Sequence, residues 1–252
     1  MIFDREGNYP GFIEYFHLLV ARSMNTRWKR RDSFWSASQT SVVWLPDVAS
    51  IVDKLVYTFT NPTKHLVVDR IEHWPGANGF RSLLSGETVC ATRPTFFFQQ
   101  PGKKRVKVRL PAEVELAMVV PPELGDADAF RARVSKAVDT RLLELAHERA
   151  NDGTRCNGLR LLDKVTWQFI PQNPIKREDR NDITPTYASK DPDHRQAAFD
   201  MRAQFLRRYR RARRRWLGRQ SYVFPIGTYA LARFARVRVR VPLIDTPVVL
   251  MH

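Results

Sequence analysis

The chain has 252 residues, of which 43% are hydrophobic, so it can bury a core and is not a wholly disordered polymer. It carries 42 Lys and Arg against 26 Asp and Glu, which gives a formal net charge of +16. Such a surplus favours a polyanionic partner, because each neutralised phosphate releases counterions. Nucleic acid is the first candidate, and an anionic membrane surface is the second.

Patterns for membrane insertion, secretion and metal binding are weak. No stretch approaches the roughly 18 apolar residues of a spanning helix. Asp4 and Glu6 stand where a signal peptide would begin its positive and apolar regions. Cys90 and Cys156 give no disulfide framework, and the histidines form neither H-x-H nor H-E-x-x-H. We therefore expect a cytoplasmic protein with no membrane partner.

The first predicted helix begins at Pro10 and ends near Asn25, with Phe12 and Phe16 on one face. A basic and aromatic loop, TRWKRRDSFW, follows it. Its cations suit phosphates, and its aromatic rings suit stacking on unpaired bases. A solvated loop around a buried tryptophan is the alternative interpretation.

Residues 41–45 predict a short strand, and Pro46 opens a second helix that runs to Asn61, before Pro62. On a helical wheel the apolar residues of this helix form a stripe about 100° wide, and Tyr57 falls opposite them. The stripe consists of Val48, Ile51, Val52, Leu55 and Phe59, and the polar face of Ser50, Asp53, Thr60 and Asn61. We expect Tyr57 to leave the helix away from the core, with Asn61 one turn further along. An ordinary half-exposed tyrosine is the alternative.

The middle of the chain is predicted to be rich in β-structure. Apolar or alternating runs at 95–98, 105–110 and 165–170 each fit a strand, and 114–120 fits a buried strand. The basic alternating runs could touch DNA or could simply protect a sheet edge. Residues 171–195 resemble a polar surface linker.

Two further helices are expected in the second half of the chain. Asp126 or Asp128 caps the first, which ends at Gly153. Its core face consists of Phe130, Val134, Val138, Leu142 and Leu145. The other, about 192–217, contains RRYRRARRR and ends at Gly218. Seven arginines so close together repel each other unless a polyanion is present; a calmodulin-type or membrane-surface helix is the alternative. An alternating basic strand is expected at 236–241.

Residues 11–76 resemble the single-tyrosine HUH transposases, and in particular the REP-associated tyrosine transposase group. The resemblance rests on a Y-x-x-x-N-P signature with a W-P pair after it, on FHLLVARSMN and on an F-W pair. These motifs are Tyr57, Asn61, Pro62, Leu66, Val67, Trp74 and Pro75, residues 16–25, and Phe34 with Trp35. The Arg-rich tail with FPIGTY resembles longer members more loosely, and residues 80–190 do not align.

The resemblance implies an α/β (α+β) fold with a ferredoxin-like HUH nuclease domain that lacks its first strands, and a basic C-terminal extension. The implied segments are 1–79 for the transposase domain, 80–190 of uncertain assignment and 191–252 for the basic extension. It also implies DNA transposition and recombination on single-stranded or hairpin DNA. Tyr57 would be the nucleophile that forms a 5′-phosphotyrosine, and Asn61 would be a ligand of Mg²⁺ or Mn²⁺.

One part of the family pattern is missing, because MIF would be the end of the strand that carries the His-x-His pair. The resemblance therefore implies a chain truncated before that pair, through a late start codon or gene decay. Since Asn61 is one weak neutral ligand, we expect these residues to bind DNA without cleaving it. The runner-up is a non-catalytic basic DNA- or RNA-binding protein. The expected DNA-binding residues are Arg22, Lys29, Arg30, Arg31, Lys64, Arg207, Arg208, Arg210, Arg211 and Arg214.

Overall fold

The computed structural model describes residues 1–4, 8–35, 42–92, 112–158, 186–240 and 249–250, with residues 160 and 164. The predicted strands at 95–98, 105–110 and 165–170 lie outside these residues, as does most of the predicted linker. The chain divides into two compact units. The first comprises Met1–Asp47, Thr92–Glu113 and Thr184–His252, and the second comprises Val48–Ala91 and Val114–Ile183.

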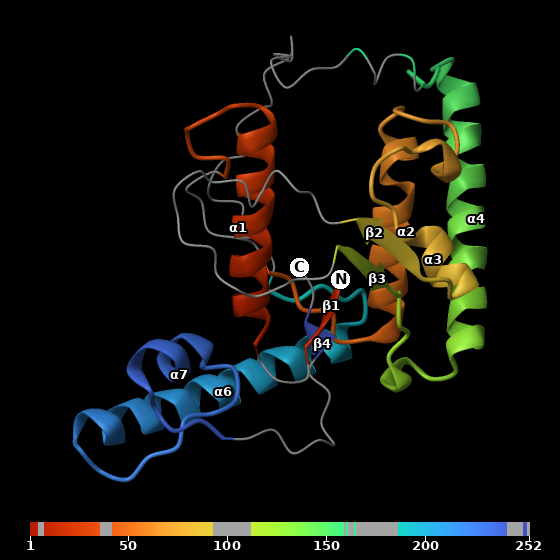
Figure 1. Cartoon of the computed structure of the whole chain (residues 1–252). Coiled ribbons are helices and arrows are strands. Elements are labelled where there is room, and N and C mark those ends of the chain that lie inside the picture. Colours follow the sequence, from red (N-terminus) through yellow and green to blue (C-terminus); the bar gives the residue numbers. More distant parts are fainter. Residues whose placement is uncertain are drawn as a thin grey trace. The chain divides into compact units, whose positions relative to one another are not determined.

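The second unit is built around two helices that pack against each other, α2 (Val48–Lys64) and α4 (Ala127–Asp152) (Figure 1). Its shorter elements are η1 (Ile71–His73), α3 (Phe80–Ser85) and η3 (Pro122–Leu124). The buried apolar residues include Ile51, Leu55 and Phe59 of α2 and Val134 and Val138 of α4. The predicted apolar stripe of the second helix is therefore the core face of this unit.

The ends of α4 follow the sequence prediction. Asp126 is the N-cap, and its carboxylate accepts a hydrogen bond of 2.8 Å from the backbone N–H of Ala129. Gly153 ends the helix in the left-handed conformation, with φ of 63°, which a glycine adopts without steric cost. Of the predicted core face, Leu142 is only half-buried, and the other four residues are buried.

α2 is longer than predicted at its C-terminal end. Pro62 was expected to lie beyond the helix, but it lies inside it, and α2 continues to Lys64. The backbone N–H of His65 donates to the carbonyl of Asn61 at 3.1 Å, so the helical hydrogen bonds resume after the proline. A proline near a helix end removes one hydrogen bond without stopping the last turn.

The predicted buried strand at 114–120 is wrong in length and burial. β3 spans only Glu113–Leu116 and pairs with β2 (Val89–Thr92) in a two-stranded sheet. Leu116 is 56% exposed and Val119 is 76% exposed. A two-stranded ribbon has no second layer over it, so an apolar run can form a strand here and still remain exposed.

The first unit contains α1 (Tyr9–Arg27), α6 (Pro192–Leu217) and α7 (Tyr229–Ala235). β1 (Ile2–Phe3) pairs antiparallel with β4 (Val249–Leu250). Where strands were predicted at 41–45 and 236–241, the described residues form only single bridges, Trp44 with Tyr187 and Phe224 with Val239. Phe224 is fully buried among aromatic side chains of α6 and the segment that follows it.

The protein is thus of mixed helix and strand, with two two-stranded sheets among the described residues. This agrees with an α+β class, and the ferredoxin-like HUH arrangement stays a prediction. No helix in the described part of the chain has both the length and the apolar character to cross a membrane.

Candidate nucleic-acid interface

Tyr57 projects from the side of α2 that faces away from α4. Ile51, Leu55 and Phe59 are 2%, 7% and 4% exposed, whereas Tyr57 is 49% exposed. The helical wheel therefore predicted the direction of this side chain correctly. A half-exposed phenol on a packed helix has a fixed backbone and an accessible hydroxyl, which is what an attacking group requires.

Two ammonium groups lie close to the Tyr57 ring. The Nζ of Lys54 lies 5.7 Å from the ring centroid, and the Nζ of Lys64 lies 5.3 Å from it. Helical side chains lean toward the N-terminus, so Lys64 at the last position of α2 reaches back over the preceding turns. Each contact is a cation–π interaction, worth about 0.5–1 kcal/mol at an exposed site. Together the two charges also make the hydroxyl end of Tyr57 attractive to a phosphate.

Asn61 follows Tyr57 by one turn of α2 but is less accessible. It is half-buried, and its Oδ1 is buried without a hydrogen-bond donor among the described residues. Thr60 and Ser50, which were expected on the exposed polar face with Tyr57, are buried instead. Thr60 can be buried because its hydroxyl donates to the carbonyl of Val56 at 2.8 Å. The accessible part of this face is thus narrower than predicted.

The segment after α2 is held by backbone hydrogen bonds from far along the chain. Leu66 has φ of 58°, which turns the chain sharply. The N–H of Asn157 donates to the carbonyl of Leu66 at 2.7 Å, and the N–H of Gly158 donates to that of Val67 at 3.0 Å. Sequence reasoning missed this contact, because backbone groups leave no residue-type signal. It fixes the end of the helix from which Lys64 projects.

The described residues do not fit a resident Mg²⁺ or Mn²⁺ ion. They contain no group of three or more His, Cys, Asp or Glu side chains that could hold a metal. Asn61 has a buried, unpaired oxygen, but a single neutral ligand does not hold a divalent ion. His65 and His73 are exposed, and His73 Nδ1 lies 2.7 Å from a carboxylate oxygen of Asp69.

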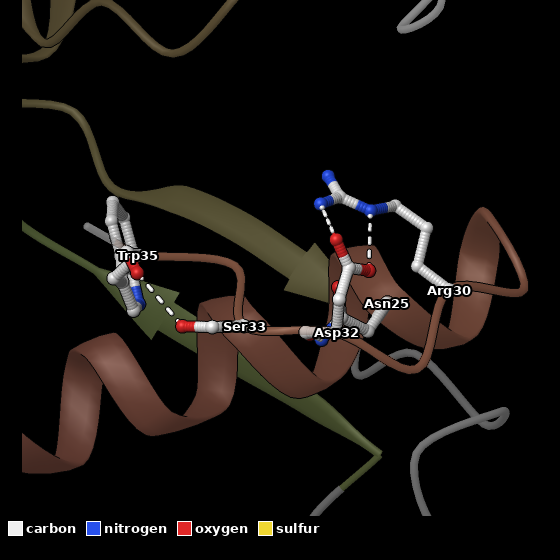
Figure 2. Close-up of polar contacts among 5 residues, drawn as sticks. All are labelled: Asn25, Arg30, Asp32, Ser33 and Trp35. Carbon is white, nitrogen blue, oxygen red and sulfur yellow. Dashed lines mark hydrogen bonds and ion pairs between the residues drawn. The ribbon is translucent and has the colours of Figure 1, made fainter. Parts of the chain in front are cut away.

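The loop after α1 is held by its own polar contacts. Figure 2 shows the guanidinium of Arg30 facing the carboxylate of Asp32. The Nε of Arg30 lies 3.1 Å from Oδ1 of Asp32, and its Nη2 lies 2.6 Å from Oδ2. Asn25 donates to the carbonyl of Asp32, and Ser33 donates to that of Trp35. Hydrogen bonding from Arg30 lowers the pKa of Asp32, and the same bond raises the pKa of Arg30. Arg30, predicted to bind DNA, is therefore already paired with an acid.

The other predicted cations of this region are exposed. Arg22, Lys29 and Arg31, together with Arg27, have no acidic partner among the described residues. Lys29 has φ of 53°, which directs the chain out of the helix into the loop. Four neighbouring positive charges without counterions form a suitable contact for a phosphate backbone.

The arginine helix α6 exposes all of its clustered charges. Its core-facing residues, with Ala212 buried and Tyr209 and Trp216 packed on Phe224, lie on one side. Every arginine of the cluster is exposed, and none has an acidic partner in the described part of the chain. The cluster consists of Arg207, Arg208, Arg210, Arg211, Arg213, Arg214 and Arg215. Arg213 and Arg215 were not in the predicted set, although both are exposed.

The predicted site residues divide between the two units. Lys64 lies beside Tyr57 in the second unit, together with Lys54, which was not in the predicted set. The predicted cations of α1, its loop and α6 belong to the first unit. Comparison with protein-family models, with curated proteins and with solved structures gives no match to the chain.

Proposed function

We propose that this chain is a transposase-type protein that binds single-stranded DNA and uses Tyr57 for transesterification. The observation that carries the proposal is the exposed Tyr57 ring, whose centroid has the ammonium groups of both Lys54 and Lys64 within 6 Å. The resemblance to single-tyrosine HUH transposases supports the same role for Tyr57. The net charge of +16 supports a polyanionic partner.

In the proposed reaction the Tyr57 hydroxyl oxygen attacks a backbone phosphorus. The bond from phosphorus to the 3′ oxygen breaks, and the phenolic proton passes through solvent to the departing 3′ oxygen. The product is a 5′-phosphotyrosine and a free 3′ hydroxyl, and one ester has replaced another. Attack by that hydroxyl reverses the step and rejoins a strand. Lys54 and Lys64 would stabilise the negative charge that develops on the phosphate.

A substrate with a better leaving group tests the covalent step without the need for a metal ion. A pool of labelled single-stranded oligonucleotides carries one 3′-bridging phosphorothiolate, whose thiolate leaves without needing a proton. These residues are expected not to cleave an ordinary phosphodiester, but the thiolate leaves without a metal, so we expect a covalent adduct on a denaturing gel with the unaltered chain and none with Tyr57→Phe. Lys54→Gln with Lys64→Gln should slow adduct formation. An adduct that persists in Tyr57→Phe would place the nucleophile elsewhere.

A non-catalytic DNA- or RNA-binding protein is the second candidate function. The observation that favours it is the set of exposed arginines on α6, which can bind a phosphate backbone without a catalytic step. The same gel separates the two functions. Oligonucleotide that is bound at equilibrium but never becomes covalently attached to Tyr57 would support binding alone.

A further inference from the structure

We propose that a row of aromatic rings along α1 and its loop is the surface on which unpaired bases stack. This inference rests on the proposed binding of single-stranded DNA, and it assigns the bases to a place in the first unit. The row, called here the aromatic row, consists of Phe12, Phe16, His17, Trp35, Phe34 and Trp28.

Each ring of the aromatic row lies next to another, with centroids 4.6 to 6.1 Å apart. The centroids of Phe12 and Phe16 are 6.1 Å apart with 9° between their planes, and Phe16 is 6.1 Å from His17. His17 is 4.6 Å from Trp35, which meets Phe34 edge-on at 4.8 Å. The row therefore runs from the first turns of α1 into the loop. Consecutive ring faces of this kind accept successive bases of any sequence.

Half of the rings in the row are exposed, and the other three, His17, Trp28 and Phe34, are partly buried. No residue of α1 is buried. Phe12, Phe16 and Trp35 are 56%, 50% and 41% exposed. Helix α2, of similar length, buries seven residues against its unit. A helix that leaves its aromatic face open has surface available to a ligand.

Charge indicates that the occupant is a nucleic acid rather than a protein with an apolar patch. The acids beside the row are already neutralised: Asp32 by Arg30, and Glu14 by Arg233 of α7. Arg22, Arg27, Lys29 and Arg31 remain without acidic partners among the described residues. Rings that stack on bases and cations that contact the adjoining phosphates are the two components of a single-strand site.

Trp35 is a ring of the row that a hydrogen bond holds in place. Its indole N–H donates a hydrogen bond of 2.9 Å to the backbone carbonyl of His17. This bond orients the ring before any ligand arrives, which reduces the ordering that binding would otherwise require. Trp35 is therefore the ring whose loss should weaken stacking most.

The experiment measures binding of the full chain to a labelled oligo(dT) and to an abasic oligonucleotide of equal length and charge. We expect the unaltered chain to prefer oligo(dT), and Trp35→Leu to bind it about tenfold more weakly, since one stacked base contributes about 1–3 kcal/mol. Trp35→Phe keeps a ring and should recover most of the affinity. Phe234→Leu removes a ring that is 73% exposed outside the row, and it should change nothing.

The outcomes separate this inference from the proposed function. If the chain prefers oligo(dT) to its abasic analogue and Trp35→Leu binds both as the unaltered chain does, the bases stack elsewhere and the inference is overturned. The inference is also overturned if Trp35→Leu and Phe16→Leu lower self-association of the chain and not its affinity, because the row is then an interface between copies. Failure of the unaltered chain to bind any single strand would instead overturn the proposed function.

Discussion

Helices α1 and α2 have similar sequence patterns but different surroundings in the structure. Both begin close to a proline and carry apolar residues at helical spacing. α2 buries Ile51, Leu55 and Phe59 in the second unit, and its accessible tyrosine lies on the opposite side. α1 buries no residue, and its phenylalanines are half-exposed.

This difference shows that an apolar stripe indicates which side of a helix avoids water, and not what covers it. In α2 the stripe meets α4, and Tyr57 on the opposite side remains half-exposed. In α1 the rings contact each other instead and stay accessible, beside cations without acidic partners among the described residues. We infer a structural role for the first stripe and a binding role for the second.

The largest expected effect is on stability, and it compares two phenylalanines. Phe59→Ala should lower the free energy of unfolding by about 3–5 kcal/mol, because it leaves a cavity between α2 and its neighbours. Phe16→Ala should change it by only about 0.5 kcal/mol, because the ring is half-exposed. Urea denaturation of both variants is the measurement. Equal losses would remove the contrast between the two helices.

The next largest expected effect is on the salt dependence of DNA binding, and it compares arginines of the two units. Arg210→Ala and Arg214→Ala in α6 should each reduce the slope of log K against log salt by about 1, because each loses one phosphate contact. Arg141→Ala in α4 is the matched control, since Arg141 is held by Glu144 and Glu148 at 2.7 and 3.0 Å. The slope is measured with a labelled oligonucleotide at four salt concentrations. An unchanged slope in both α6 variants would move the phosphate contacts to another surface.

A cap in the first unit should respond to pH. Asp191 accepts hydrogen bonds from the backbone N–H of Asp193 and from His194, and the Asp193 bond is the main cause of its lowered pKa. The stabilisation is therefore present above the ordinary pKa of an aspartate, about 4, and is lost as the pH falls through the lower folded value.

Asp191→Ala should cost about 1 kcal/mol at pH 7, as for other N-caps. Asp191→Asn should keep most of the cap and weaken the acid dependence, because an amide does not titrate. Thermal unfolding at pH 7 and pH 3 measures both. If Asp191→Asn loses stability on acidification as steeply as the unaltered chain, another carboxylate is responsible.

The smallest expected effect is that of Tyr57→Phe on stability and on binding. The substitution removes an exposed hydroxyl and no charge, so the free energy of unfolding should change by less than about 0.5 kcal/mol. Affinity for oligo(dT) should be unchanged, while the covalent adduct is lost. A large destabilisation would mean that the hydroxyl has a structural role that its exposure does not suggest.

The sequence predicted those features that depend on local periodicity and caps. The direction of Tyr57, an aspartate cap at 126 or 128 and the Gly153 end of α4 follow from spacing and residue type, and all three are confirmed, with Asp126 as the cap. The predicted burial of residues 114–120 was wrong, because an apolar run does not determine whether a second layer of structure covers the strand.

The sequence did not show which side chains would pair with one another. Arg30 was predicted to bind DNA, but in the structure its charge is already paired with that of Asp32. The order of the aromatic row also depended on contacts that no spacing encodes, such as the bond from Trp35 to the carbonyl of His17. Lys54 was not among the predicted site residues, and its place over the Tyr57 ring came from the structure.

The most direct test of the central claim is the equilibrium binding of the full chain to a single strand and to a duplex of equal total charge. It is measured by fluorescence anisotropy at about 50 and 200 mM salt, because charge and stacking respond differently to salt. We expect affinity for both to fall steeply with salt, and the single strand to remain favoured at both concentrations. Equal affinity for the two, or affinity that does not change with salt, would contradict the account.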